Sequence, residues 1–376
     1  MKKIVCVLLT LLLLICTTAC ADNKISNTGK TEYKIAVITK PLSEDRETFE
    51  NAQQLQKKHG ESIVSLTFPH NYATHPEQIV STMTALADDP DVRVIIIPDV
   101  VDGTTVGIQK LRETRNDILI ISGMNTENAA EIAPFSDLCL IEDKTATGTT
   151  IIEQAVAMKA KTFVYITCQS DLTNSAISAH EELLKEASSS AGISFVEAIA
   201  PDSLGAENIR DTQSWINENV PLYVDECGKN TAFYATNEAM SIPLIRQVAA
   251  CGAILPQLCN PSPYHGYPEA FDIDLAGHEA DTSYLLHQIK SVIASYNNEG
   301  RMAAWSVSQN AIVLNAGVDY SLQWCNGTVK KRCHRSTMAK SIRSVADNET
   351  TVEYYTDEKL GKISHSFAIQ DAYYIF

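Results

Sequence analysis

Polar side chains follow several of the apolar runs in this sequence, and they are the residues best placed to do chemistry. Open α/β sheets bind ligands at the carboxyl ends of their strands, so such side chains could hydrogen-bond a small molecule. Asp and Asn are also common caps and turn formers, whereas Lys40 and Gln169 are poor ones. The candidate ligand-binding residues of this kind are Lys40, Asp99, Asn125, Asp143, Gln169, Asn237 and Glu238.

Aromatic residues provide a second group of candidates. The stretch 260–271, NPSPYHGYPEAF, is too rich in Pro and Gly for regular structure, and it places Tyr264 and His265 on a loop. Tyr264 and Trp305 could stack on a flat ligand. Alternatively, these rings cover the edge of a core, and the sequence leaves both interpretations open.

Asn237 and Glu238 stand where an apolar run gives way to helical spacing. If Asn237 were the N-cap of that helix, Pro243 would fall where its ring and missing N–H disturb the helix. Ser241 as the N-cap would place Pro243 within the first turn, where no donor is needed. We therefore predict that Ser241 caps the helix and that Asn237 is available to a ligand.

Common enzyme motifs are absent from the sequence. It contains no G-x-G-x-x-G after a strand, no phosphate-binding loop, no G-x-S-x-G and no H-E-x-x-H. We predict a protein that is not an enzyme and needs no cofactor or metal. A hydrolase that uses Asp99 and Glu238 as a carboxylate pair remains an alternative.

The cysteines suggest no standard metal site. Cys325, Cys333 and His334 fit no common zinc spacing and lack a fourth ligand. Cys325 and Cys333 bracket an Asn-Gly turn signal, so they could close a short disulfide loop or remain free thiols. The sequence does not decide between these two states.

The N-terminus has the pattern of an export signal. Two lysines precede an apolar run over 4–16, which is too short to span a bilayer as a helix. The small residues before Cys20 resemble the lipobox of bacterial lipoproteins, although Thr17 stands where Leu is usual. We predict a signal peptide over 1–19, a lipid-modified Cys20, a tether over 20–32, and a location on the outer face of a bacterial cell membrane.

Composition and charge limit the remaining possibilities. The 376 residues are 45% hydrophobic, enough for more than one core, and the formal net charge is −16. This charge opposes nucleic-acid binding. We therefore predict two domains and no nucleic-acid partner.

Short apolar runs alternate with amphipathic ones along most of the chain. Most of the runs are continuous, as expected for strands buried on both faces of a parallel sheet. Strands are predicted over 34–40, 62–69, 92–99, 117–123, 137–143, 162–168, 194–200, 232–238 and 253–259. Helices are predicted over 44–58, 76–87, 104–115, 147–160, 174–187, 206–217, 241–250, 280–294 and 336–345. Repeated strand-helix units indicate a doubly wound α/β fold, followed by a tail of mixed strands and turns from about 302.

Two stretches carry a resemblance to a known family. AFYATNEAM, with Asn237 and Glu238, and LIEDKTATGTTIIEQAV, with Asp143, resemble the type I periplasmic binding proteins, whose ligand-sensing domain is shared with LacI-type repressors. Glu238 departs from the Asp that is usual in the family. The resemblance implies two Rossmann-like lobes joined by a three-strand hinge. Lobe 1 would comprise 33–142 and 262–300, and lobe 2 would comprise 143–261 and 301–376.

The resemblance also implies a function. Asp99 and Asn125 from one lobe, and Gln169 and Asn237 from the other, would hold a small polar ligand such as a sugar or nucleoside. We predict a monomeric, lipid-anchored receptor that delivers this ligand to the permease of an ABC importer. A sensory or quorum-type receptor that signals to a membrane sensor is the alternative. An export signal and the absence of an N-terminal DNA-binding helix pair argue against a repressor.

Overall fold

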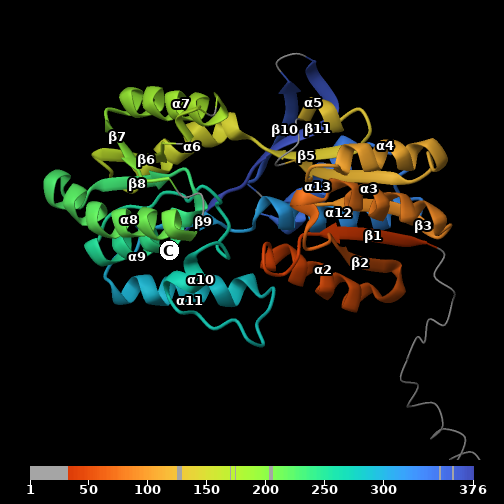
Figure 1. Cartoon of the computed structure of the whole chain (residues 1–376), viewed down its shortest axis with the longest axis horizontal. Coiled ribbons are helices and arrows are strands. Elements are labelled where there is room, and N and C mark those ends of the chain that lie inside the picture. The colour runs from red at the N-terminus through yellow and green to blue at the C-terminus, as the bar shows by residue number, and fades with distance from the viewer. Residues whose placement is uncertain are drawn as a thin grey trace, which may run out of the picture. The chain divides into compact units, whose positions relative to one another are not determined.

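The chain from Tyr33 onward folds into two lobes, each built on its own β-sheet (Figure 1). The computed structural model describes residues 33–124, 129–169, 171–173, 175–202, 206–346, 349–357 and 360–376. Within these ranges, no helix is long and apolar enough to cross a membrane. The predicted signal peptide, Cys20 and the tether lie outside the described residues, so they remain predictions.

Lobe 1 contains a seven-stranded sheet in the order β10-β11-β5-β4-β3-β1-β2. Only β10, at one edge, runs antiparallel to its neighbour. Successive side chains along a strand, such as Val37 and Ile38, pack into cores on opposite faces of the sheet. This explains the continuous apolar runs. The strands are β1 (Lys34–Thr39), β2 (Ile63–Thr67), β3 (Val92–Ile97), β4 (Leu119–Met124), β5 (Leu138–Glu142), β10 (Thr351–Asp357) and β11 (Gly361–Gln370).

Helices cover both faces of this sheet. One face packs against α2 (Arg46–His59), α12 (Gln309–Cys325) and α13 (Arg335–Val345). The other face packs against α3 (Pro76–Ala85), α4 (Thr104–Thr114) and α5 (Ala129–Ile132). Gly317 lies where α12 approaches β3 and β4, since a Cβ there would stand 3.3 Å from Ile96 Cγ2.

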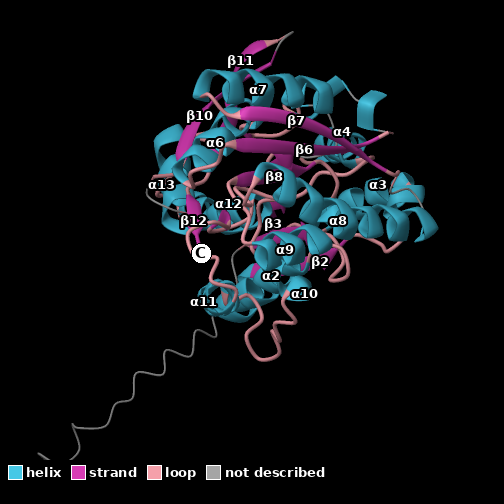
Figure 2. Cartoon of the chain, turned by 90° about the vertical axis from the view of Figure 1, so that its left-hand side faces the viewer, coloured by secondary structure: helices cyan, strands magenta, loops and turns pink. Residues whose placement is uncertain are grey.

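Lobe 2 is also a sheet between helices, as Figure 2 shows from its own side. Its parallel strands β7 (Ser194–Ala200), β6 (Thr162–Cys168) and β8 (Thr231–Ala235) lie in that order. Single bridges, Ala232 to Ile254 and Leu255 to Met302, extend the pairing towards β9 (Ala303–Trp305), which pairs antiparallel with β12 (Tyr373–Ile375).

The helices of lobe 2 form two layers around this sheet. The layer of α6 (Lys144–Ala157) and α7 (Ser175–Ala191) packs on one face. The other face packs against α8 (Ala206–Cys227), α9 (Ser241–Cys251), α10 (Tyr267–Ala270) and α11 (Thr282–Ser295).

The chain crosses between the lobes three times, over 142–144, 305–309 and 370–373. We call these segments the three crossings. Side-chain hydrogen bonds link these segments to one another and to α6. Thr147 Oγ1 donates to Gln370 Oε1 at 2.8 Å, and Ser306 Oγ donates to the buried carboxylate of Asp371 at 2.9 Å.

The structure corrects the lobe assignment of the C-terminal half. Residues 262–300 were predicted in lobe 1, but Leu285, Ile289 and Ile293 of α11 pack into the core of lobe 2. Residues 301–376 were predicted in lobe 2, but α12, α13, β10 and β11 belong to lobe 1. The reason is the order of the crossings: the chain stays in lobe 2 through β9, returns to lobe 1, and re-enters lobe 2 only for β12.

Two local predictions also differ from the structure. The predicted strand 253–259 makes only isolated bridges, at Ile254 and Leu255. The predicted mixed tail contains the 17-residue helix α12, of which ten residues are buried. A helix enclosed in this way is apolar on most sides and lacks a clear amphipathic pattern.

Candidate functional site

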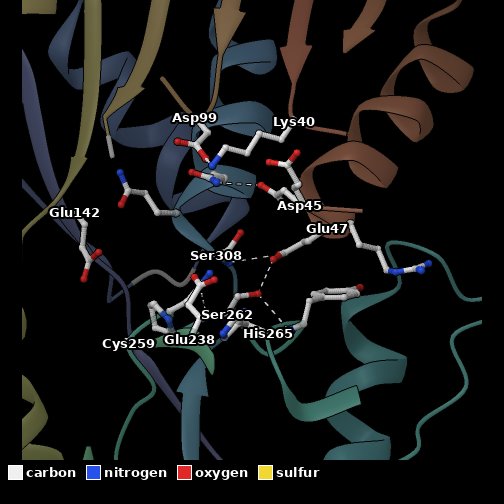
Figure 3. A pocket seen from close by; sticks show the side chains of 17 residues that line it. Lys40, Asp45, Glu47, Asp99, Glu142, Glu238, Cys259, Ser262, His265 and Ser308 are labelled. Carbon is white, nitrogen blue, oxygen red and sulfur yellow. Dashed lines mark hydrogen bonds and ion pairs between the residues drawn. The ribbon is translucent and has the colours of Figure 1, made fainter. Parts of the chain in front are cut away.

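A cavity of about 410 Å³ opens where the two lobes meet near the crossings (Figure 3). This volume is typical of pockets for small molecules. Its walls come from the first turns of α2 and α12, from strand ends of lobe 1, and from loops of lobe 2. The lining residues are Lys40, Glu44, Asp45, Arg46, Glu47, Asp99, Glu142, Glu238, Cys259, Asn260, Pro261, Ser262, Tyr264, His265, Ser308, Gln309 and Asn310.

Lys40 and Asp99 form an ion pair in the lobe 1 wall. The register of the parallel strands β1 and β3 places Val37 beside Ile96, and three residues further the same register brings Lys40 opposite Asp99. Asp99 is buried and Lys40 is partly exposed. Burial by itself lowers the pKa of Lys40, but the carboxylates of Asp99, Asp45 and Glu44 outweigh burial and raise it.

The residues that lead into α2 supply further acidic groups. Asp45 is the N-cap of this helix and accepts from the backbone N–H of Thr48 at 3.0 Å. Asp45 also accepts a hydrogen bond from Asn310 Nδ2 at 3.0 Å, which links the N-termini of α2 and α12. Glu44 accepts from the hydroxyl of Tyr72 at 2.5 Å. The carboxylates of Asp45 and Glu44 are therefore held in fixed positions at the cavity.

Glu47 is the most unusual group in the wall. It belongs to α2, is only 4% exposed, and accepts from Ser262 Oγ of lobe 2 at 2.6 Å. It also accepts from the backbone N–H of Ser308, the N-cap of α12, at 3.4 Å. Burial raises the pKa of Glu47 to about 7, although the bonds from Ser262 and Ser308 oppose the rise. This carboxyl therefore joins both lobes and exchanges its proton near neutral pH.

The lobe 2 wall carries Glu238, Cys259 and His265 (Figure 3). Glu238 is exposed, and its carboxylate has no hydrogen-bond or ion-pair partner among the described residues. Burial and the nearby Glu238 raise the pKa of the Cys259 thiol to about 12, so it is not a thiolate nucleophile at neutral pH. His265 Nε2 is buried without a hydrogen-bond partner in the described part of the chain.

Four residues singled out from the sequence line this cavity: Lys40, Asp99, Glu238 and Tyr264. Asp143 lies at the first crossing, where its N–H donates to the carbonyl of Ile369 at 2.9 Å. Gln169 is exposed just after β6 and does not line the cavity. Asn125 lies outside the described residues. The binding roles of these residues remain predictions.

The helix-capping argument for Asn237 is corrected by the structure. Asn237 caps a short 3₁₀ turn, Glu238–Met240, by accepting from Ala239 N at 3.0 Å, and α9 follows directly. Ser241 is the first residue of α9, not its cap, and Pro243 lies in the first turn. The 3₁₀ turn before α9 therefore gives Asn237 the capping role from which it was predicted to be free, and Asn237 does not line the cavity.

Trp305 cannot act as a stacking platform in this structure. Its side chain is fully buried, and β9, on which it lies, pairs with β12 through Tyr373. Tyr264 is 9% exposed and lies at the cavity wall. Of the two open interpretations of these rings, the structure supports a core role for Trp305.

The cavity residues at the N-termini of α2 and α12 were not identified from the sequence. Asp45, Glu47 and Ser308 line the cavity because α2 and α12 both begin there. The sequence signal for them is an N-cap residue ahead of a helix. Asp45 precedes an amphipathic helix, and Ser308 precedes the apolar stretch that begins at Ala311. Nothing local marked Ser262, whose partner Glu47 is 215 positions away.

The structure also bears on the cysteines and on the side chains that could bind a metal. Cys325 and Cys333 are free thiols, as are the other five cysteines of the described ranges. Over the same ranges, no group of three or more His, Cys, Asp or Glu side chains is arranged to hold a metal ion.

The two-lobed fold is that of the type I periplasmic binding proteins, as solved structures show. A protein provisionally described as a transcriptional regulator from Clostridium difficile 630 superposes with a TM-score of 0.81 at 19% identity, covering 93% of this chain and 100% of that one. A sugar ABC transporter protein from Actinomyces odontolyticus ATCC 17982 gives a TM-score of 0.52 at 11% identity, over 92% of this chain and 95% of that one. A substrate-binding protein of a sugar ABC transport system from Bordetella parapertussis 12822 gives 0.51 at 12% identity, over 92% and 89%.

Residues 33–303 match the model of the family described as "Protein of unknown function (DUF3798)", and the chain belongs to this family. Two uncharacterised proteins of Treponema pallidum (strain Nichols) are similar in sequence. One is 24% identical over 173 residues, 46% of this chain and 80% of that relative. The other is 26% identical over 190 residues, 48% of this chain and 86% of that relative.

Proposed function

We propose that this protein is a lipid-anchored solute receptor on the outer face of the cell membrane, which captures a small polar molecule between its lobes for an ABC importer. The cavity of about 410 Å³ carries the proposal. Its walls come from both lobes, so one molecule bound there could contact Lys40 of lobe 1 and Glu238 of lobe 2.

Binding would be converted into a signal by the relative position of the lobes. A ligand that touches both walls stabilises the closed arrangement more than an open one, because only the closed arrangement makes all the contacts. The three crossings are short and can act as the hinge. A membrane permease would then recognise the closed shape.

A sensory receptor is the second candidate. It is favoured by the structural similarity to the Clostridium difficile protein that is provisionally described as a regulator. Both candidates use the same cavity, so they differ in the partner and not in the site. Deleting the chromosomal copy distinguishes them: loss of uptake of the bound compound indicates import, and loss of a transcriptional response with normal uptake indicates sensing.

Ligand capture is tested by thermal unfolding of the full chain, purified in detergent, with and without a small-molecule extract of bacterial cells. A binding protein gains RT ln(1 + [L]/Kd) in unfolding free energy, so Tm should rise in the extract. Native mass spectrometry should then recover a bound compound with its mass unchanged. No rise in Tm with a complete extract would contradict the proposal, and a chemically altered compound would indicate an enzyme.

Lipid anchoring is tested separately through Cys20. The wild-type chain should incorporate labelled palmitate and partition into detergent on phase separation. Cys20→Ser should do neither, while Cys16→Ser, a change within the predicted signal, should still be labelled. Equal labelling of the Cys20→Ser variant would exclude this anchor.

A further inference from the structure

The charges around the cavity are strongly unbalanced. Two basic side chains, Lys40 and Arg46, line it. Lys40 is paired with Asp99, and the exposed Arg46 is paired with Glu50 Oε1 at 2.9 Å. Facing them are six carboxyl groups, from Glu44, Asp45, Glu47, Asp99, Glu142 and Glu238.

The excess of carboxylates is not explained by the helix N-termini at the cavity. Asp45 caps α2 and offsets the positive end of that helix, and the carboxyl of Glu47 accepts from the N-cap N–H of α12. Glu44, Glu142 and Glu238 lie beyond these caps. Glu238 in particular has no partner among the described side chains.

Carboxylates of the wall also affect the pKa of nearby titratable groups. The pKa of Lys40 is raised by three carboxylates in spite of its burial. Burial and Glu238 raise the pKa of Cys259. Burial, Glu44 and Asp99 raise the pKa of Tyr72, which does not line the cavity but donates to the wall residue Glu44. Negative potential therefore comes from both lobes, and it favours a positive ligand over a neutral or negative one.

The other polar groups of the wall agree with a ligand that donates hydrogen bonds. The carboxylate of Glu238 can only accept, so it suits a ligand with N–H or O–H groups. The aromatic rings in the wall, Tyr264 and His265, are too few for an aromatic cage around a quaternary ammonium. A bare metal ion is far smaller than a cavity of about 410 Å³.

We propose that the molecule captured in this cavity is a small organic cation with N–H donors, a protonated primary or secondary amine, held between Glu238 of lobe 2 and the carboxylates of lobe 1. This inference rests on the proposed function. Glu238 would contribute a charge-assisted hydrogen bond, and closure would exclude water and strengthen it.

The test divides the cell extract on a cation-exchange resin at pH 7. The retained fraction contains the organic cations, and the unretained fraction contains neutral and anionic compounds. The Tm of the full chain in detergent is measured in each fraction, and a larger rise in the retained fraction is expected. A rise as large or larger in the unretained fraction overturns the inference while leaving the proposed function intact. No rise in either fraction overturns the proposed function, and the inference with it.

A variant then tests the residue directly. The compound eluted from the retained fraction is titrated against wild type, Glu238→Gln and the exposed surface control Glu113→Gln. Glu238→Gln should weaken binding about tenfold, the loss of one charge-assisted contact, and Glu113→Gln should bind as wild type. Affinity should also fall as salt rises. Equal affinity of Glu238→Gln and wild type, with unchanged Tm of the free proteins, contradicts the assignment of Glu238.

Discussion

Glu47 Oε2 accepts a hydrogen bond from Ser262 Oγ at 2.6 Å, and this bond joins helix α2 of lobe 1 to a loop of lobe 2. Both side chains are buried. A buried carboxyl at a contact between lobes makes that contact sensitive to its proton, because the charged form is poorly solvated there.

Replacing Glu47 with Gln should remove a pH dependence of stability. The folded protein holds this proton until about pH 7, whereas the unfolded chain releases it near the ordinary value of 4.5. Its contribution to the free energy of unfolding is therefore complete below pH 4.5 and is lost as pH rises through 7, by on the order of 3 kcal/mol. Thermal unfolding between pH 5 and 8 should show wild type losing more stability than Glu47→Gln.

The control for this change is Glu113→Gln, on the exposed face of α4. It should follow the wild-type profile, because its carboxyl is solvated in both states. Parallel profiles for wild type and Glu47→Gln would show that Glu47 does not change its proton affinity on folding.

Lys40 and Asp99 should be energetically coupled. Lys40→Met removes the ammonium that faces a buried carboxylate. We therefore expect the free energy of unfolding, measured with urea, to fall by about 2–4 kcal/mol. Adding Asp99→Asn removes the charge that Lys40 compensates, and the double variant should be more stable than the sum of the single changes predicts.

The exposed ion pair of Lys185 and Glu197 is a matched comparison for this cycle. Its side chains are 49% and 50% exposed, so solvent screens the pair and its coupling should be much weaker than that of the buried pair. Additive effects for Lys40 and Asp99, like those expected for the exposed pair, would contradict a stabilising contact.

Asp371 should hold the crossings together. It is 2% exposed and accepts from Ser306 Oγ at 2.9 Å and from Thr350 Oγ1 at 2.6 Å. Asp371→Asn leaves one acceptor oxygen in place of two. We therefore expect the free energy of unfolding, measured by thermal unfolding, to fall by about 1–3 kcal/mol. Limited proteolysis should also cut the 305–309 and 370–373 crossings faster. Asp225→Asn, on the exposed side of α8, should change neither rate nor stability.

Cys325 and Cys333 should both react as thiols once the protein is unfolded. Alkylation in denaturant without reductant, followed by peptide mass analysis, should find an adduct on each. In the folded protein Cys325 should react slowly, because burial raises its pKa to about 11 and leaves little thiolate. Recovery of a peptide with these residues linked would show a disulfide instead.

The sequence predicts most strands and also α11 and α13, but it does not predict α12, and the physical reason is burial. Strands β1, β3 to β6 and β8 coincide with continuous apolar runs, because a parallel sheet covered on both faces needs apolar residues in succession. The edge strands β2 and β7 are partly exposed and include polar residues. The same burial concealed α12, whose residues from Ala311 to Val318 give an apolar run without a polar face.

Part of the cavity wall could also be anticipated. Lys40 and Asp99 are predicted because each follows an apolar strand. In the structure, these strands, β1 and β3, are adjacent and parallel, so their carboxyl ends meet at one edge. The same rule also selected Asp143 and Gln169, which lie elsewhere, since it does not say which strand ends face the opposite lobe.

The sequence by itself determined the doubly wound α/β class and the polar residues that could line a site, because periodicity and strand ends are local properties of the chain. Only the tertiary structure decided which of them share a cavity and that Glu47 is buried against Ser262. These depend on where the chain crosses between lobes, and residues 215 positions apart meet through packing that no local pattern records.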